Sequence, residues 1–111
     1  MSNLDALLNF FKAENERDWA KYRGYLHSDI AWTLFSRQGA QLVRGIDAYM
    51  DKMLAAYRDI PDTFVCEQSY TGQSGNRVVT VLRNCHGQRS VDIFDFADGL
   101  IWREYEFLLD E

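Results

Sequence analysis

The sequence predicts a single α+β domain in which helices cover one face of a mostly antiparallel sheet. Three observations support this fold class: helical periodicity in the first half, strand-like alternation in the second, and an Asp98-Gly99 turn near the end. The chain has 111 residues, of which 47% are hydrophobic and 14% aromatic, which is enough for one packed core. Because neither a repeat nor a linker interrupts it, we assign residues 1–111 to one domain.

The first part of the chain predicts two helices and a strand. Apolar residues recur at helical spacing over residues 3–14, and Ser2 with Asp5 resembles a capping box. After a polar break, a second helix of roughly ten residues ends at His27-Ser28-Asp29. Residues 30–35 then predict a strand.

A third helix and four further strands complete the expected order. Residues 36–41 predict a polar turn, and residues 45–58 a helix with a wide apolar face. Strands follow at about 63–71 and 77–85, and the last two flank the Asp98-Gly99 turn. The predicted order is therefore α-α-β-α-β-β-β-β.

The final hairpin carries acids among aromatic residues. Asp92 and Phe94 share one face of the first strand, and Glu104 and Glu106 share one face of the second. A carboxylate in apolar surroundings is costly unless it is paired, and such groups cluster at functional sites. The hairpin is therefore where function should be sought.

Composition and motifs argue against several functional classes. The net charge is −5 and the basic residues form no stripe, so neither nucleic acid nor an anionic membrane is an expected partner. No apolar run is long enough to span a membrane, and we find no dinucleotide or phosphate-binding motif. The histidines and acids lack metal-ligand spacing, so we expect no metal and no cofactor. Cys66 and Cys85 are expected to be reduced thiols, which predicts a cytoplasmic location.

The order of these motifs resembles a known family. The motifs are the passage from Tyr25 to Trp32, the helix start Gly45-Ile46-Asp47, and Val91-Asp92-Ile93-Phe94 followed by Asp98-Gly99-Leu100-Ile101. Together they resemble the NTF2-like superfamily and are most similar to small SnoaL-like proteins. The resemblance implies a strongly curved sheet that forms a cone with an internal pocket. It also implies a homodimer formed through the outer sheet face.

One branch of that superfamily, the ketosteroid isomerases, provides a test of single residues. The resemblance places Asp92 at the position of that family's protonated aspartic acid. The general base of the family falls at about Leu34 and its phenol at about Leu7. Because leucine occupies two of the three catalytic positions, we do not expect that mechanism here.

The resemblance and the strand alternation together give the candidate pocket residues. Tyrosine and tryptophan would present polar groups on aromatic bodies, which suits a ring-shaped ligand, although each alone is more often a core residue. His27 also fits a structural role at a helix end. The pocket set is Trp32, Leu34, Tyr22, Tyr49, Met53, Phe94 and His27.

The candidate catalytic set is Asp92, Glu104, Glu106 and Arg83. If His86-Gly87 is a two-residue turn, Arg83 lies diagonal to Asp92 on the inner face and sets the charge of the site. The alternative for Asp92 is a structural acid satisfied by Arg83. One alternative for the two glutamates is a solvated position at the pocket mouth. Another is that their strand has the reverse parity, which turns both side chains onto a dimer face.

Two functional hypotheses remain open at this stage. The first is a cofactor-independent enzyme that isomerises, cyclises or dehydrates a small, largely hydrophobic molecule by acid/base chemistry. The second is a non-catalytic ligand-binding or dimeric interaction module. A homodimer is predicted in either case from an outer apolar set that comprises Val91, Ile93, Ile101, Tyr105 and Phe107.

Overall fold

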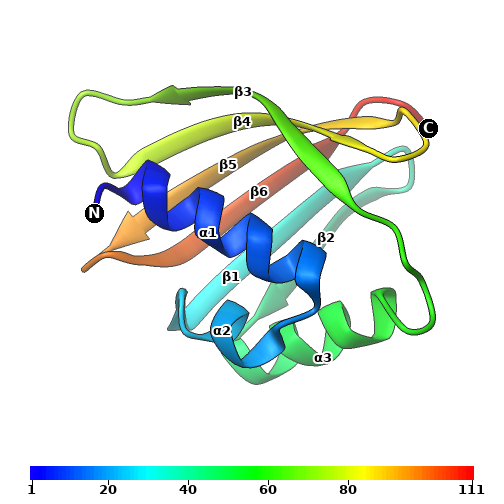
Figure 1. Ribbon diagram of the computed structural model, residues 1–111, viewed down its shortest axis with the longest axis horizontal. Helices are drawn as coiled ribbons and strands as arrows, with labels where there is room; N and C mark the ends of the chain where they lie inside the picture. The colour runs from blue at the N-terminus through cyan, green and yellow to red at the C-terminus, as the bar shows by residue number, and fades with distance from the viewer.

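The computed structural model describes residues 1–111 as a six-stranded sheet with three helices (Figure 1). The helices are α1 (Asn3–Glu16), α2 (Trp19–Arg23) and α3 (Ile46–Ala56). The strands are β1 (Leu26–Ser36), β2 (Gly39–Arg44), β3 (Phe64–Thr71), β4 (Arg77–Asn84), β5 (Arg89–Ala97) and β6 (Leu100–Leu108). Their order across the sheet is β2-β1-β6-β5-β4-β3, and only β1 and β6 pair in parallel.

The helices lie on one side of this sheet. In Figure 1, α1 runs across the sheet face, whereas α2 and α3 lie together beside β1 and β2. The predicted capping box is confirmed, because the Ser2 hydroxyl accepts the Asp5 N–H at 3.0 Å and the Asp5 carboxylate accepts the Ser2 N–H at 3.3 Å. None of the three helices is both long enough and apolar enough to cross a membrane.

An aromatic cluster fills the space between the helices and the sheet. Phe10 of α1 stacks on Tyr22 of α2 with 4.1 Å between ring centroids. Phe11 of α1 packs edge-on against Phe94 of β5 at 5.6 Å. All four rings are at most 6% exposed, so burial of their apolar surface anchors α1 and α2 to the sheet.

The predicted α+β class and the closing hairpin are confirmed. Asp98 and Gly99 both have positive φ, at 53° and 77°, as a two-residue type I′ turn requires. The turn and a one-residue bulge in β6 after Ile101 together align β5 with β6 so that Asp92 is the register partner of Glu106 and Phe94 that of Glu104.

The predicted elements of the first half are wrong in two respects: one strand is missing and one boundary is misplaced. Residues 39–44 form strand β2, where a turn was expected, so the order is α-α-β-β-α-β-β-β-β. β2 is an edge strand whose side chains are almost all exposed, and it therefore lacks the apolar alternation that marks a strand. His27 and Asp29 belong to β1 and not to the end of the second helix.

The predicted register between β4 and β5 is also wrong, and the error moves Arg83 to the other face of the sheet. The turn contains three residues, 85–87, because the Asn84 N–H donates to the Gln88 carbonyl at 2.9 Å. Thr80, not Val81, is therefore the partner of Asp92. A register change of one residue reverses the face of every side chain. Arg83 consequently lies on the outer face, where it pairs with Glu67 at 3.3 Å.

A second irregularity corrects the predicted outer face. Between the pairs Asp95–Arg103 and Phe96–Ile101 the register of β6 shifts by one residue. This bulge turns Ile101 inward, where it is 0% exposed. Ile101 therefore belongs to the core and not to the expected apolar patch.

Candidate functional site

A cavity of about 380 Å³ lies between α1, α3 and the inner face of the sheet. Its volume falls in the range of about 300–1,000 Å³ that is usual for small-molecule pockets. Most of its apolar wall is aromatic, and its polar wall is rich in carboxyl groups. The apolar lining comprises Phe10, Phe11, Met53, Tyr57, Phe64, Leu82, Phe94 and Leu108. The acidic lining comprises Glu14, Asp92, Glu104, Glu106, Asp110 and Glu111.

Three of these acids come together because the strand register places them side by side. Asp92 on β5 faces Glu106 on β6, and Glu104 lies two residues before Glu106 on the same face. Carboxylate oxygens of the three residues lie within 4.8 Å of one another. Asp92 is 3% exposed and Glu104 5%, so bulk water cannot screen the repulsion between them. The three candidate acids predicted from the sequence are therefore neighbours in one cavity.

Two hydroxyl groups hydrogen-bond to Asp92 in the cavity. The Ser90 hydroxyl donates to Asp92 Oδ1 at 2.5 Å, and the Thr80 hydroxyl donates to the Asp92 backbone carbonyl at 3.3 Å. Burial raises the pKa of Asp92 well above its ordinary value, the negative charge of Glu106 raises it further, and Ser90 opposes the increase.

Glu104 ends a buried chain of hydroxyl groups. The Tyr49 hydroxyl donates to Glu104 Oε1 at 2.6 Å, and the Tyr22 and Tyr49 oxygens are 2.9 Å apart. Since Tyr49 uses its proton toward Glu104, Tyr22 donates to Tyr49. Burial raises the pKa of Glu104 well above its ordinary value, and Glu106 adds to the increase. The two tyrosines thus hold Glu104 through this chain of hydrogen bonds and do not line the cavity.

Glu106 differs from the other acids in having no hydrogen bond of its own within the chain. Burial raises its pKa, and the nearby Trp32 indole opposes the increase, although Trp32 Nε1 is too poorly placed to form a hydrogen bond. Glu106 itself is a cause of the raised pKa values of Asp92, Glu104 and Glu14. The charge of Glu106 therefore affects the protonation of the other three acids.

Glu14 is a fourth cavity acid, largely shielded from solvent, that the sequence interpretation missed. It lies in the last turn of α1, and burial raises its pKa from an ordinary value of 4.5 to about 7. The Tyr57 hydroxyl donates to Glu14 Oε2 and opposes that increase. The guanidinium group of Arg17 lies 4.1 Å from the centre of the Tyr57 ring. A signal was present in the sequence, because Glu14 continues the helical stripe of Leu7 and Phe11 at intervals of three and four residues.

The arginine nearest to the cavity does not neutralise this cluster. Arg89 lines the cavity, but its guanidinium Nε donates to Asp110 Oδ2 at 3.1 Å. Arg83 was expected to set the charge of Asp92, and it lies on the opposite face of the sheet. The inner acids therefore keep raised pKa values because burial is not compensated by a cation.

The predicted pocket residues separate into two groups. Met53 and Phe94 line the cavity. Trp32 and Leu34 occupy the inner face beside Glu104 and Glu106 but do not border the cavity. His27 does not border it either, and its Nδ1 accepts the Asp29 N–H at 3.0 Å.

The sequence matches the SnoaL-like domain over residues 7–104, which is most of the chain. The chain belongs to the SnoaL-like family. No curated protein shows significant sequence similarity to it.

Solved structures support the assignment of this SnoaL-like chain to the NTF2-like fold. An NTF2-like protein from Cytophaga hutchinsonii is 15% identical with a TM-score of 0.78, and the match covers 98% of this chain and 91% of that one. A Mycobacterium tuberculosis protein in complex with estradiol-17beta-hemisuccinate is 15% identical with a TM-score of 0.81, covering 96% and 93%. A computationally designed 17-OHP binder is 15% identical with a TM-score of 0.78, covering 96% and 92%. At these identities the likeness establishes the fold and leaves the ligand of this SnoaL-like protein open.

Proposed function

We propose that the cavity binds a small, largely hydrophobic molecule and catalyses a cofactor-independent acid/base reaction of the isomerase, cyclase or dehydratase type. The observation that carries the proposal is the group of four acids in an aromatic cavity, Glu14, Asp92, Glu104 and Glu106, whose pKa values are all raised mainly by burial. Groups with raised pKa values can hold a proton at neutral pH and donate it to a substrate.

The pKa values divide the roles among the acids. Glu106 loses its proton first, because its pKa is raised by burial alone whereas its negative charge helps to raise the others. The ionised Glu106 is therefore the general base. The raised pKa values of Asp92 and Glu104 favour their protonated forms beside it, which suits the role of general acid. Glu14, with a pKa of about 7, can return a proton between turnovers near neutral pH.

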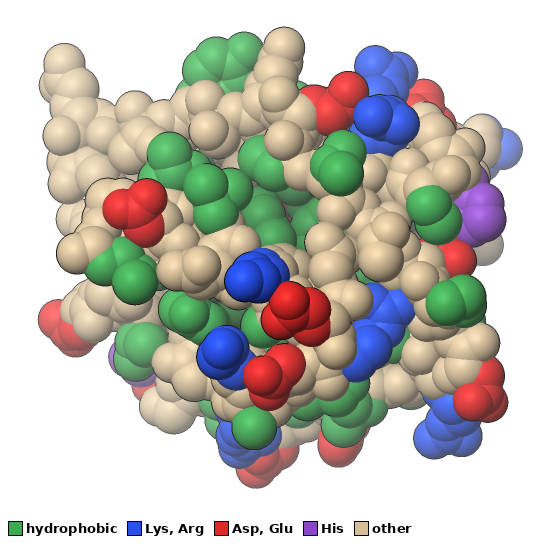
Figure 2. All heavy atoms as spheres, in the orientation of Figure 1, with side chains coloured by type: hydrophobic (Ala, Val, Ile, Leu, Met, Phe, Trp, Pro, Cys, Tyr) green, Lys and Arg blue, Asp and Glu red, His purple; other side chains and the backbone are tan.

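The shape and lining of the cavity favour a neutral, apolar substrate. Phe10, Phe11 and Phe94 line it and pack edge-to-face against one another, and these rings give a large apolar contact area. The steroid ester bound by the Mycobacterium tuberculosis protein and the ligand named for the designed binder support a hydrophobic ligand for this fold. Mixed charges on the face shown in Figure 2, where acidic and basic side chains alternate, give no support to a polyanionic partner.

The second candidate function is a non-catalytic binding module that acts as a homodimer. The observation that favours it is the outer sheet face, where the register places Phe35, Phe107, Val91 and Val81 in one row across four adjacent strands. The rings of Phe35 and Phe107 stack at 4.5 Å, and Phe107 remains 36% exposed. A contiguous apolar row of this kind is unusual on a monomer surface. We propose a second copy of the chain as its partner.

Screening and mutation test the catalytic proposal. A metabolite library is screened by thermal shift, since a ligand that binds the folded state raises the melting temperature. Turnover of each hit is then measured with Asp92→Asn and Glu106→Gln, which keep the side-chain size and remove the ionisable group. We expect both variants to bind the hit and to lose at least about 100-fold in turnover. Asp95→Asn, a change on the outer face of the same strand, is the matched control.

Full turnover by either cavity variant on an identified substrate would contradict the catalytic assignment. Binding without any turnover by the wild type would favour the binding module. Light scattering tests the dimer separately, and a 13 kDa species at micromolar concentration would contradict it. The cytoplasmic location stays a prediction, which the free thiols of Cys66 and Cys85 support.

A further inference from the structure

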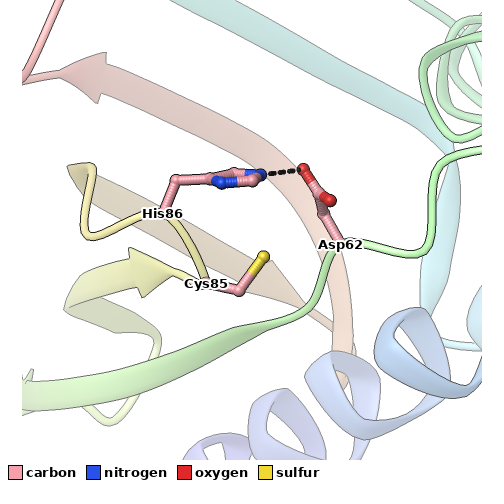
Figure 3. Close-up of side chains that lie close together, drawn as sticks. All are labelled: Asp62, Cys85 and His86. Carbon is pink, nitrogen blue, oxygen red and sulfur yellow. Dashed lines mark hydrogen bonds and ion pairs between the residues drawn. The ribbon is translucent and has the colours of Figure 1, made fainter.

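A second cluster of reactive side chains lies outside the cavity, where the α3–β3 connection meets the β4–β5 turn. Figure 3 shows Cys85 and His86 pointing toward Asp62 across this junction. One ligand-type atom from each, the thiol sulfur, an imidazole nitrogen and a carboxylate oxygen, lies within 4.8 Å of the other two. His86 Nε2 and Asp62 Oδ2 are already 2.9 Å apart.

The turn explains why two consecutive residues face the same partner. In a strand, Cys85 and His86 would point to opposite faces. The three-residue turn interrupts that alternation, with Gly87 at a φ of 82° that suits glycine best. The Asn84 side chain fixes the turn, because its Oδ1 accepts the His86 N–H at 2.9 Å and the Gln88 N–H at 3.0 Å.

Hydrogen bonds also hold the backbone on either side of Asp62. Arg17 donates through Nη2 to the carbonyl oxygens of Ile60 at 2.7 Å and Asp62 at 2.6 Å. The Cys85 N–H donates to the Thr63 carbonyl at 3.0 Å, which joins the two backbone segments beside the cluster. The three side chains are therefore held close together by backbone contacts that do not depend on any ion.

We propose that Asp62, Cys85 and His86 bind one zinc ion through a carboxylate oxygen, the thiolate and an imidazole nitrogen. Thiolate, imidazole and carboxylate are the three ligand types that zinc takes in proteins, at about 2.0–2.3 Å from the metal. Ligand atoms of a tetrahedral zinc site are about 3.5 Å apart, so the three atoms need move by only roughly 1 Å. The fourth position is left to water. Binding removes the thiol proton to the solvent, and no group is oxidised or reduced.

A bound ion would link two segments of the chain that border the cavity. Asn84 and Gln88, which flank the turn, both line the cavity, as does Phe64 just beyond Asp62. An ion bound by both the turn and the α3–β3 connection would crosslink these two segments. The inner acids of Asp92, Glu104 and Glu106 are the competing cation site, but they offer only oxygen ligands, which suit magnesium or calcium better than zinc.

Cobalt(II) provides the most specific test, because cobalt bound to a thiolate gives a charge-transfer absorption band that oxygen ligands do not give. Tag-free protein is titrated with Co²⁺ and, by calorimetry, with Zn²⁺. We expect one equivalent of each to bind, with a thiolate band that Cys85→Ser abolishes and the matched control Cys66→Ser retains. We expect His86→Gln and Asp62→Asn each to weaken zinc binding at least about tenfold.

Circular dichroism of the metal-free variants is the control that checks whether each one is folded. Absence of the thiolate band in the wild type would overturn the proposal, as would its persistence in Cys85→Ser. Zinc binding that is lost in Glu106→Gln but kept in Cys85→Ser would assign the ion to the cavity acids instead and would also overturn it.

Discussion

Replacing Glu14 with glutamine tests the electrostatics of the cavity through protein stability. The pKa of Glu14 rises from 4.5 to about 7 in the folded protein, mainly because of burial. A carboxyl group with a higher pKa in the folded state holds its proton more tightly there. The stabilisation from that proton is complete below pH 4.5 and is lost as the pH rises through about 7. The difference corresponds to about 3 kcal/mol, at about 1.36 kcal/mol per pKa unit.

Glu14→Gln removes this pH dependence and leaves an amide oxygen that can accept the Tyr57 hydroxyl. Urea unfolding of the two proteins is measured between about pH 4.5 and pH 8. We expect the free energy of unfolding of the variant, minus that of the wild type, to increase by about 3 kcal/mol over this range. Tyr57→Phe supplies the opposite control, because it removes a hydrogen bond that lowers the pKa of Glu14 and so steepens the loss of stability. A difference that stays constant with pH would refute the account of Glu14.

Two further predictions concern the parts of the fold that position the site. Tyr49→Phe leaves the buried Glu104 without its hydroxyl donor and should lower the free energy of unfolding by about 1–3 kcal/mol, measured with urea. Tyr70→Phe, at a side chain 60% exposed, should change it far less, and equal effects would contradict the buried chain. Gly99→Ala should cost about 1–2 kcal/mol because Gly99 has a φ of 77°. Gly72→Ala, at a glycine without positive φ, is the comparison, and a similar cost there would contradict the turn assignment.

Local sequence signals predicted those elements whose structure depends on neighbouring residues. The capping box at Ser2 and the Asp98-Gly99 turn each depend on residues that are close in sequence. The family resemblance and strand alternation together placed Asp92, Glu104 and Glu106 on one face, since the turn without the bulge would pair Asp92 with Tyr105. That much of the site followed from the sequence.

The remaining features depend on single-residue irregularities that the periodic pattern does not reveal. A turn of three residues in place of two moved Arg83 to the outer face, and a bulge moved Ile101 into the core. Glu14 stands at the predicted end of the first helix, and its neighbours Asn15 and Glu16 are also polar, so the pattern did not mark it as a cavity residue. Only the packing of α1 against the sheet shows that this acid faces Tyr57 in the cavity.

Carbon-13 NMR of the aspartate and glutamate carboxyl groups tests the central claim most directly, because the chemical shift reports the protonation of each group. The account predicts that Glu106 loses its proton first among the four cavity acids. It predicts that Glu14 titrates at about 7 and that the pKa values of Asp92 and Glu104 lie well above their ordinary values. Titration of all four groups near the ordinary values of about 3.9–4.3 would contradict the claim that this cavity is an acid/base site.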